Sequence, residues 1–447
     1  MTRALRVAIV GAGPAGIYAA DILDKSDADV SIDLYERLPA PFGLIRYGVA
    51  PDHPRIKGIV NALHKVLDKP NIRLLGNVDY GTDLKLDELR EFYDAIVFST
   101  GAADDRSLDL PGIDLPGSYG AADFVSWYDG HPDVPREWPL NATSVAVLGV
   151  GNVALDVARI LAKTADELLA TEIPDNVYQG LAASPVTDVH VFGRRGPAQA
   201  KFTPQELREL DHSPNVEVIV YPEDIEFDEG SIAEMRAHKQ TDMVVKTLQE
   251  WAIRDQGDRP KRLHLHFFHS PAEVLGDSAV SGLRTERTEL TGDGSVRGTG
   301  EFHDWDVQAV YRAVGYLSSP LSEVPFDHRT GTVPNDAGRV LDIDGDQVPG
   351  VYVTGWIKRG PVGLIGHTKG DALETIRNLL DDADSLRPAS QPDPDAVLEF
   401  LEQRGVEYTT WQGWYQLDAH ERALGEANGR ERIKVVPREE MLRASRD

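Results

Sequence analysis

Two glycine-rich turns most constrain what this chain can fold into. Each turn lies between a short run of apolar, largely β-branched residues and an amphipathic stretch of helical periodicity. The turns contain Gly11, Gly13 and Gly16 in the first copy, and Gly149, Gly151 and Ala154 in the second. Such a turn lets backbone amides and a helix N-terminus approach a pyrophosphate closely, so each copy predicts one bound dinucleotide. The fold class expected is therefore α/β, with two Rossmann-like dinucleotide-binding domains.

The residues after the second strand of each unit predict two different dinucleotides. In the first unit this strand ends in Glu36, about 20 residues after the glycines, and its carboxylate can accept both ribose hydroxyls of FAD or NAD. In the second unit the corresponding strand is followed by Arg194 and Arg195 and by no acid. Guanidinium groups match the oxygens of a 2'-phosphate, which indicates NADP(H). We therefore expect FAD in the first unit and NADP(H) in the second.

Charge and composition exclude several classes of partner. The formal net charge is -27, whereas nucleic acids and anionic membranes bind positively charged surfaces. No apolar run approaches the length of a membrane span, and the first apolar run is already the first strand. We expect a cytoplasmic protein, a monomer or weak dimer, that neither binds nucleic acid nor inserts into a membrane.

The chain contains no cysteine, and this restricts its redox chemistry. A disulfide reductase needs a thiol pair, and an iron-sulfur cluster needs thiolate ligands. Any electrons that leave a flavin must therefore pass to a separate partner, a small molecule or dioxygen.

The order of the segments predicts that one domain is inserted into the other. The strand at residues 94–101 closes the first unit, and a similar strand-and-glycine stretch at residues 348–355 returns the chain to it. We expect a discontinuous FAD-binding domain at residues 1–104 and 319–447, and an NADP-binding domain at residues 105–318. The turn-rich segment 108–117 is expected to be the domain crossing, and segment 223–255 an acidic helical insert.

Four longer strings resemble one family. They are VAPDHPRIK at residues 49–57, GVGNVALDVAR at 149–159, GRRGPAQAKFTPQELREL at 193–210 and GWIKRGP at 355–361. Together they resemble the adrenodoxin reductase type of ferredoxin-NADP reductase, particularly its bacterial members. The resemblance extends from about residue 6 to about residue 436.

The resemblance implies contacts for both cofactors. For FAD they are Ala15, Glu36, Leu44, Val78, Trp356, Gly363, Leu364 and Ile365. For NADP they are Arg106, Gly151, Asn152, Val153, Ala154, Arg194, Arg195, Glu206 and Gly363. The chain departs from the family at Val362, where the family commonly has Thr, and at His367. Glycines 360, 363 and 366 also suit close approach of a helix N-terminus to a reduced flavin.

His53 and Glu206 are the candidate catalytic residues. By themselves, a histidine in a turn and a glutamate on an amphipathic helix are more often surface groups. The resemblance instead implies that both lie near the nicotinamide and the flavin, where they position the nicotinamide and provide a proton route.

The implied reaction is hydride transfer from NADPH to FAD, followed by single-electron transfer to a ferredoxin-type iron-sulfur protein. An NADPH reductase or diaphorase with a small-molecule acceptor is the main alternative, and a non-catalytic NADP sensor is the third. Arg236, Lys239 and Lys246 lie at i, i+3 and i+10 in the expected helical insert, which places them on one face. We expect such a basic patch to dock an acidic ferredoxin.

Overall fold

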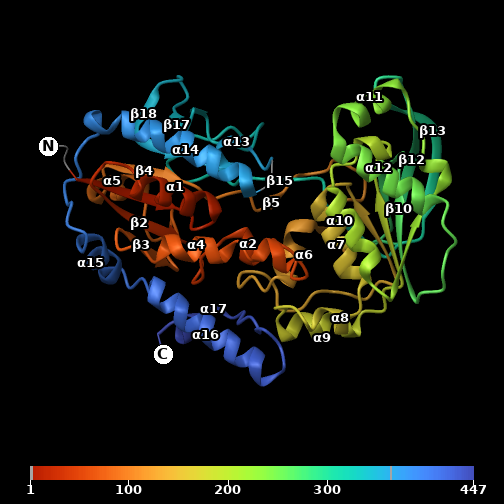
Figure 1. Ribbon diagram of the computed structural model, residues 1–447, viewed down its shortest axis with the longest axis horizontal. Coiled ribbons are helices and arrows are strands. Elements are labelled where there is room, and N and C mark those ends of the chain that lie inside the picture. The colour runs from red at the N-terminus through yellow and green to blue at the C-terminus, as the bar shows by residue number, and fades with distance from the viewer. Residues whose placement is uncertain (1–3, 363–364, 447) are drawn as a thin grey trace.

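The computed structural model describes residues 4–362 and 365–446, arranged around two large sheets. Figure 1 shows the first sheet on the left and the second on the right, with the C-terminal helices beneath them. None of the helices in this described part of the chain has the length and apolar character required to cross a membrane.

The first sheet has seven strands, drawn from both ends of the chain. Their order is β16 (Asn335–Asp336), β17 (Arg339–Leu341), β18 (Gln347–Val353), β4 (Ala95–Phe98), β1 (Leu5–Val10), β2 (Val30–Glu36) and β3 (Ile72–Gly76). β18 pairs in parallel with β4, with Val351 opposite Ile96. The chain thus returns to the first sheet at β18, as the sequence predicts.

Helices cover both faces of this first sheet, which is why all six residues of β1 are buried and five of them are apolar. One face packs against α1 (Pro14–Asp24), α4 (Val60–Leu67), α14 (Ile365–Asp381) and α16 (Trp411–Ala427). The other packs against α5 (Leu86–Phe92) and α15 (Ala396–Gln403).

The second sheet has six parallel strands. Their order is β6 (Ser118–Gly120), β14 (Ala309–Arg312), β7 (Ser144–Leu148), β8 (Asp188–Phe192), β10 (Lys261–His266) and β9 (Val216–Val220). One face is covered by α6 (Ala121–Tyr128), α7 (Asn152–Ala162) and α12 (Lys239–Ala252). Both large sheets therefore have the predicted α/β character.

A three-stranded antiparallel sheet, which is not among the predicted elements, covers the other face of the second sheet. It consists of β11 (His269–Leu275), β12 (Gly282–Leu290) and β13 (Val296–Trp305). Leu283 and Val274 from this sheet pack on Phe192 and Leu148 from the large one. The polar exposed residues of β13 carry little apolar alternation, which explains why this layer is hard to read from the sequence.

The remaining helices are short connections or peripheral elements. They are α2 (Leu44–Tyr47), α3 (Pro54–Lys57), α8 (Ala165–Leu168), α9 (Asp175–Ala183), α10 (Pro204–Glu209), α11 (Glu229–Ala237), α13 (Trp356–Arg359) and α17 (Arg438–Ala444), with 3-10 turns at Pro197–Gln199, Leu210–His212, Pro222–Asp224 and Ala383–Ser385.

Two expectations about the middle of the chain are wrong. Residues 108–117 do not form the crossing between the sheets, because the Val274 amide donates to the Pro111 carbonyl and Ile113 packs into the second unit's core. The chain crosses instead at β5 (Asp104–Asp105) and β15 (Tyr316–Leu317), which pair antiparallel. The insert is also not one helix, because α11 ends at Ala237 and α12 begins at Lys239.

Candidate functional site

The first glycine turn has a backbone that only glycine tolerates. Gly11 has a φ of +111°, and an added Cβ would lie 2.6 Å from the Ser99 carbonyl oxygen. A Cβ on Gly16 would lie 2.0 Å from the Gly11 carbonyl oxygen. Gly13 caps the N-terminus of α1 and has no atom closer than 3.9 Å to an added Cβ. The turn therefore packs tightly toward β4 and leaves its ligand side open at Gly13.

The expected FAD contacts gather around this turn. Glu36 ends β2, and its carboxylate accepts hydrogen bonds from the amides of Ala12 at 3.1 Å and Leu38 at 3.1 Å. Burial raises the pKa of Glu36, whereas these amides oppose the rise. The Val78 amide donates to the Glu36 carbonyl at 2.9 Å, which brings buried Val78 to the same place.

Two later segments meet the same helix N-terminus. Gly43, which precedes Leu44 at the start of α2, lies so close to Gly13 that its added Cβ would be 3.1 Å from the Gly13 Cα. Gly355 precedes Trp356 at the start of α13, and its added Cβ would be 2.7 Å from the Cβ of Ala15. Leu44 and Trp356 are thus brought to α1 from distant parts of the chain.

The glycine-rich stretch after α13 is described only in part. Gly363 and Leu364 lie outside the described residues, and Ile365 opens α14. Asp371 on α14 accepts a hydrogen bond from the Gly355 amide and lies 2.9 Å from the Lys358 ammonium. No sequence signal indicated that Asp371 and Lys358 fix this turn.

The second glycine turn repeats the geometry of the first. Gly149 has a φ of +133°, and its added Cβ would lie 2.2 Å from the Ala313 carbonyl oxygen. Gly151 caps α7, and an added Cβ there would meet no described atom within 4 Å. Asn152 accepts a hydrogen bond from the Thr203 amide at 2.9 Å. Val153 and the fully buried Ala154 complete the first turn of α7.

The three candidate phosphate-binding arginines lie at the ends of strands. Arg194 and Arg195 follow the end of β8 after Gly193, as predicted. Within residues 4–362 and 365–446, neither guanidinium forms an ion pair with a carboxylate, so both charges are available to an anion. Arg106 is exposed beside β5, and its amide donates to the Gly315 carbonyl. The second turn and these strand ends therefore offer backbone amides and guanidinium groups suited to a phosphorylated dinucleotide.

His53 and Glu206 come together although 153 positions separate them in the numbering. His53 caps α3, Glu206 lies on α10, and their side chains are 2.9 Å apart between Nε2 and Oε2. Asp156 Oδ1 lies 2.9 Å from the same Nε2, and Glu209 Oε2 lies 2.8 Å from Nδ1. His53 itself is buried.

Arg159 on α7 closes this cluster. Its guanidinium forms two hydrogen bonds of 2.8 Å with Asp52 and one of 2.7 Å with Asp156. Lys163 lies 2.7 Å from Asp52. Asp52 and His53 belong to the first unit and the other groups to the second, so the cluster joins the two units. Figure 1 shows α7 and α10 next to each other on the side of the second unit that faces the first.

The cluster fixes the charge of His53. Burial disfavours the imidazolium, but the hydrogen bonds to Asp156 and Glu206 outweigh it and raise the pKa of His53 to about 10. The Asp52 carboxylate is also buried, but Arg159 and Lys163 hold its pKa well below its usual value. The site therefore presents a positively charged proton donor at neutral pH.

Four residues of this cluster are not among the functional residues predicted from the sequence. Asp52, Asp156, Arg159 and Glu209 all lie within the strings that carry the family resemblance. Their spacing on helices was a usable signal, because Asp156 and Arg159 are three residues apart and so share a face.

The expected basic patch does not form as described. Arg236 belongs to α11, whereas Lys239 and Lys246 belong to α12, with the break at His238. Lys246 is also paired with Asp242 at 2.7 Å. The one-helix geometry on which the patch rested is wrong.

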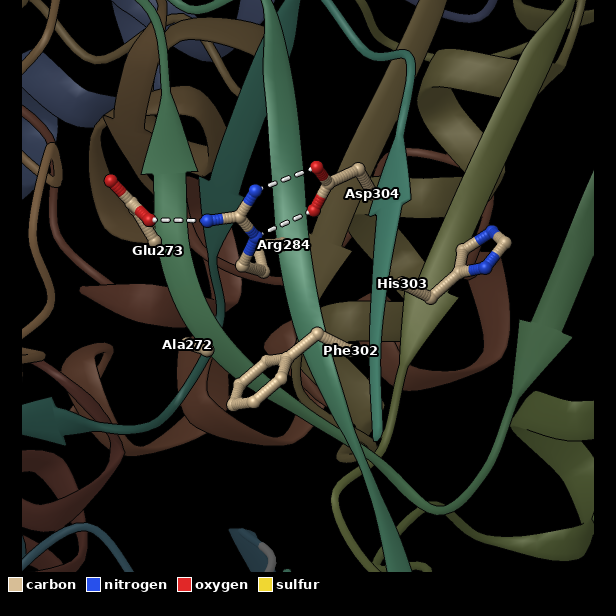
Figure 2. Close-up of a pocket in the computed structure, with 6 residues that line it drawn as sticks. All are labelled: Ala272, Glu273, Arg284, Phe302, His303 and Asp304. Carbon is tan, nitrogen blue, oxygen red and sulfur yellow. Dashed lines mark hydrogen bonds and ion pairs between the residues drawn. The ribbon is translucent and has the colours of Figure 1, made fainter. Parts of the chain in front are cut away.

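A hollow on the outer face of β11–β13 offers no free charged group to a ligand. Figure 2 shows Arg284 between Glu273 and Asp304, with Phe302 beside them. The guanidinium forms hydrogen bonds of 2.7 and 2.8 Å with Asp304 and of 3.1 Å with Glu273. The Arg284 guanidinium is thus already paired with the carboxylates of Asp304 and Glu273.

Comparison with known proteins gives consistent matches. Residues 5–195 match the sequence family described as pyridine nucleotide-disulphide oxidoreductase. NADPH-ferredoxin reductase FprA of Mycobacterium tuberculosis (strain ATCC 25618 / H37Rv) is 40% identical over 455 residues, which cover 98% of each chain. Mitochondrial NADPH:adrenodoxin oxidoreductase of Homo sapiens is 40% identical over 455 residues, which cover 98% of this chain and 91% of the human one. The structure of Mycobacterium tuberculosis FprA in complex with NADPH is similar with a TM-score of 0.91 and 39% identity over all of both chains.

Proposed function

Since the chain belongs to the family of NADPH-ferredoxin reductases and NADPH:adrenodoxin oxidoreductases, we propose that it oxidises NADPH and reduces a ferredoxin-type iron-sulfur protein through FAD. The supporting observation is the contrast between the two glycine turns. Each opens a helix after the first strand of its own unit, but Glu36 ends the second strand of one unit, and Arg194 and Arg195 follow that of the other. FAD, when bound, accepts a hydride and releases electrons one at a time.

The residues of the first unit suit FAD. Gly13 is open toward a ligand, and the close approach of Gly43 places the start of α2 at the same helix terminus. We assign to Glu36 the ribose hydroxyls, and to Ala15, Leu44, Val78 and Trp356 contacts with the remainder of the molecule. We also retain Gly363, Leu364 and Ile365 as proposed contacts on the basis of the family resemblance.

The residues of the second unit suit NADPH. We assign the 2'-phosphate to Arg194 and Arg195, and the pyrophosphate to the turn that runs from Gly151 to Ala154. Arg106 would contact the same ligand from the crossing strand β5. Among the described residues, no carboxylate forms an ion pair with either of these guanidiniums, which supports the assignment because a bound phosphate would break no such pair.

His53 and Glu206 are proposed to act on the nicotinamide end. His53 holds a proton and a positive charge where the two units meet, and Glu206 and Asp156 fix the orientation of its ring. Replacing His53 or Glu206 by Ala should slow reduction of the flavin by NADPH and leave FAD bound, because neither side chain lies at the first glycine turn. Stopped-flow measurement of flavin bleaching tests this, and unchanged rates in both variants would remove the assigned role.

The function is tested by anaerobic reduction followed by a choice of acceptors. The FAD-loaded protein is reduced with NADPH and mixed with ferredoxin or with a small quinone. Carrier-dependent reduction of cytochrome c through ferredoxin supports the proposal. Efficient turnover with the quinone and none with any ferredoxin would contradict it and favour a diaphorase.

The domain limits and the setting of the protein are proposals as well. We propose limits at 104/105 and 318/319, which the pairing of β5 with β15 supports. We also propose a cytoplasmic location and a monomer or weak dimer, which cell fractionation and analytical ultracentrifugation test.

A further inference from the structure

Three histidines gather on the second sheet, away from both glycine turns. His190 lies on β8, and His264 and His266 lie on the neighbouring strand β10. The register places His190 directly opposite His264. Because side chains two residues apart on a strand share a face, all three imidazoles lie on one side of the sheet.

Their ring nitrogens are close enough to share an ion. His190 Nδ1 and His266 Nε2 are 3.0 Å apart, and the rings of His190 and His264 stack at 4.3 Å. One nitrogen from each of the three residues lies within 4.8 Å of those of the other two. Two nitrogens bound tetrahedrally to zinc at 2.0–2.1 Å are separated by about 3.3 Å, so the first pair is already near ligand spacing.

Neighbouring groups orient the cluster as they do in metal sites. Asp188 Oδ1 lies 3.2 Å from His264 Nε2, and the Tyr221 hydroxyl lies 2.9 Å from His264 Nδ1. A carboxylate that accepts the second N–H of a ligand histidine fixes its tautomer and raises its basicity. The cluster thus has an orienting carboxylate as well as three imidazoles.

Two of the three imidazoles are shielded from solvent. His264 and His266 are buried, and Trp305 from β13 covers His266 with 4.5 Å between ring centroids.

We propose that His190, His264 and His266 bind a divalent transition-metal ion of borderline softness, with Zn²⁺ as the ion of reference. Imidazole nitrogens are preferred ligands of Zn²⁺, Cu²⁺ and Ni²⁺, and three of them leave a fourth position for water. The ion replaces the hydrogen bond between His190 and His266 and, because Nε2 of His264 stays with Asp188, also the one between Nδ1 of His264 and the Tyr221 hydroxyl. It cross-links β8 and β10 close to the strand end that carries Arg194.

A second group of possible ligands within the described residues is less suitable. His53, Glu206 and Glu209 also present atoms within 4.8 Å of one another. There, however, the Arg159 guanidinium lies 2.7 Å from His53 Nε2, and the imidazole holds a proton. A metal ion would have to displace both positive charges.

The test is zinc binding to the FAD-loaded protein after removal of metals with a chelator. Titration calorimetry should show one equivalent of Zn²⁺, the thermal midpoint should rise on binding, and zinc-edge X-ray absorption should show imidazole scattering at about 2.0 Å. His190→Gln and His264→Gln should each weaken binding by about 100-fold or more, and Asp188→Asn by about 10- to 100-fold. Far-ultraviolet circular dichroism and flavin content verify that each variant is folded, and the half-exposed position of His190 gives a second variant if His264→Gln does not fold.

His303→Gln is the matched control, because His303 makes an edge-to-face contact with Trp305, with 4.3 Å between ring centroids, but lies outside the three-histidine group. It should bind zinc like the unchanged protein. Equal binding by His190→Gln and His264→Gln, or the absence of a saturable equivalent in the unchanged protein, would overturn the proposal. A contrary result is that zinc slows flavin reduction by NADPH in the unchanged protein but not in His53→Ala. That result would place the ion at the His53 cluster and would also overturn the proposal.

Discussion

At the scale of single residues, the charge of His53 depends on groups that come from two different units. One imidazole lies within 3 Å of Asp156, Glu206 and Glu209, while Arg159 limits their excess negative charge. The cluster is therefore proposed as part of the reaction site, and its ion pairs also connect the two units.

The free energy of unfolding should report the pKa of His53. Its pKa is about 10 in the folded protein, compared with 6.5 for an ordinary histidine, so its stabilising contribution is complete below pH 6.5 and is lost as the pH rises through 10. The stability difference between the unchanged protein and His53→Gln should thus be large at pH 6 and shrink toward pH 10. Urea unfolding at both pH values measures it, with the exposed His238→Gln as control. A difference that does not vary with pH would contradict the raised pKa.

Coenzyme preference should depend on the two arginines after β8. Replacing Arg194 and Arg195 by Gln removes charged hydrogen-bond donors worth roughly 1.5 to 3 kcal/mol each, so kcat/KM should fall for NADPH and change little for NADH. Steady-state kinetics with both coenzymes measures the ratio. Arg236→Gln, on the exposed surface of α11, is the control and should leave it unchanged. An unaltered ratio in the double variant would refute the 2'-phosphate assignment.

At the scale of elements, each glycine turn divides its glycines between two physical roles. Gly149 provides a positive φ and close packing, whereas Gly151 borders open space at the helix N-terminus. The first role belongs to the fold, and the second belongs to ligand binding.

Alanine substitutions should separate these roles. Gly149→Ala places a Cβ 2.2 Å from the Ala313 carbonyl oxygen at a φ of +133°, so it should lower the free energy of unfolding by about 1 to 3 kcal/mol or more. Gly151→Ala should leave stability nearly unchanged and weaken NADPH binding, because its Cβ points into the proposed pyrophosphate site. Urea unfolding and NADPH titration of both variants measure the two effects. Equal loss of stability in both would mean that the turn has only a structural role.

At the scale of the whole molecule, the C-terminal segment joins both units through buried charges. The Lys434 ammonium donates to the carbonyls of Arg46 and Asp129 at 2.7 and 3.0 Å and lies 2.9 Å from Glu172. Lys57 lies 2.8 Å from the same Glu172. The first unit, the second unit and the C-terminal segment therefore meet at one carboxylate.

Removing that carboxylate should loosen the joint. Among the described residues, Glu172→Gln leaves the Asp129 carboxylate, at 3.4 and 3.5 Å, as the one negative charge beside Lys57 and Lys434. The change should cost about 3 to 5 kcal/mol of stability and expose the C-terminal segment to proteolysis. Glu431→Gln is the control, because Glu431 is 73% exposed and 3.9 Å from Arg422, and it should cost less than about 1 kcal/mol. Urea unfolding and limited trypsin digestion compare the two variants. The same small effect in both would show that the buried network does not hold the units together.

The sequence by itself determined the parts that depend on neighbouring residues. The glycine turns, the strands before them and the helices after them follow from local backbone requirements, and the return of β18 to β4 follows from a repeated apolar pattern. The chemical contrast between Glu36 and the arginines after β8 could also be predicted, because position at a strand end is a local property.

Only the tertiary structure decided the parts that depend on distant residues. The partners of His53 lie 103 to 156 positions away in the chain, and no periodicity specifies which carboxylates meet across a domain seam. The break at His238 removed a patch that an ideal helix would have formed. The three-histidine group exists because the register places β10 beside β8, and hydrogen bonding between strands fixes a register that local sequence leaves open.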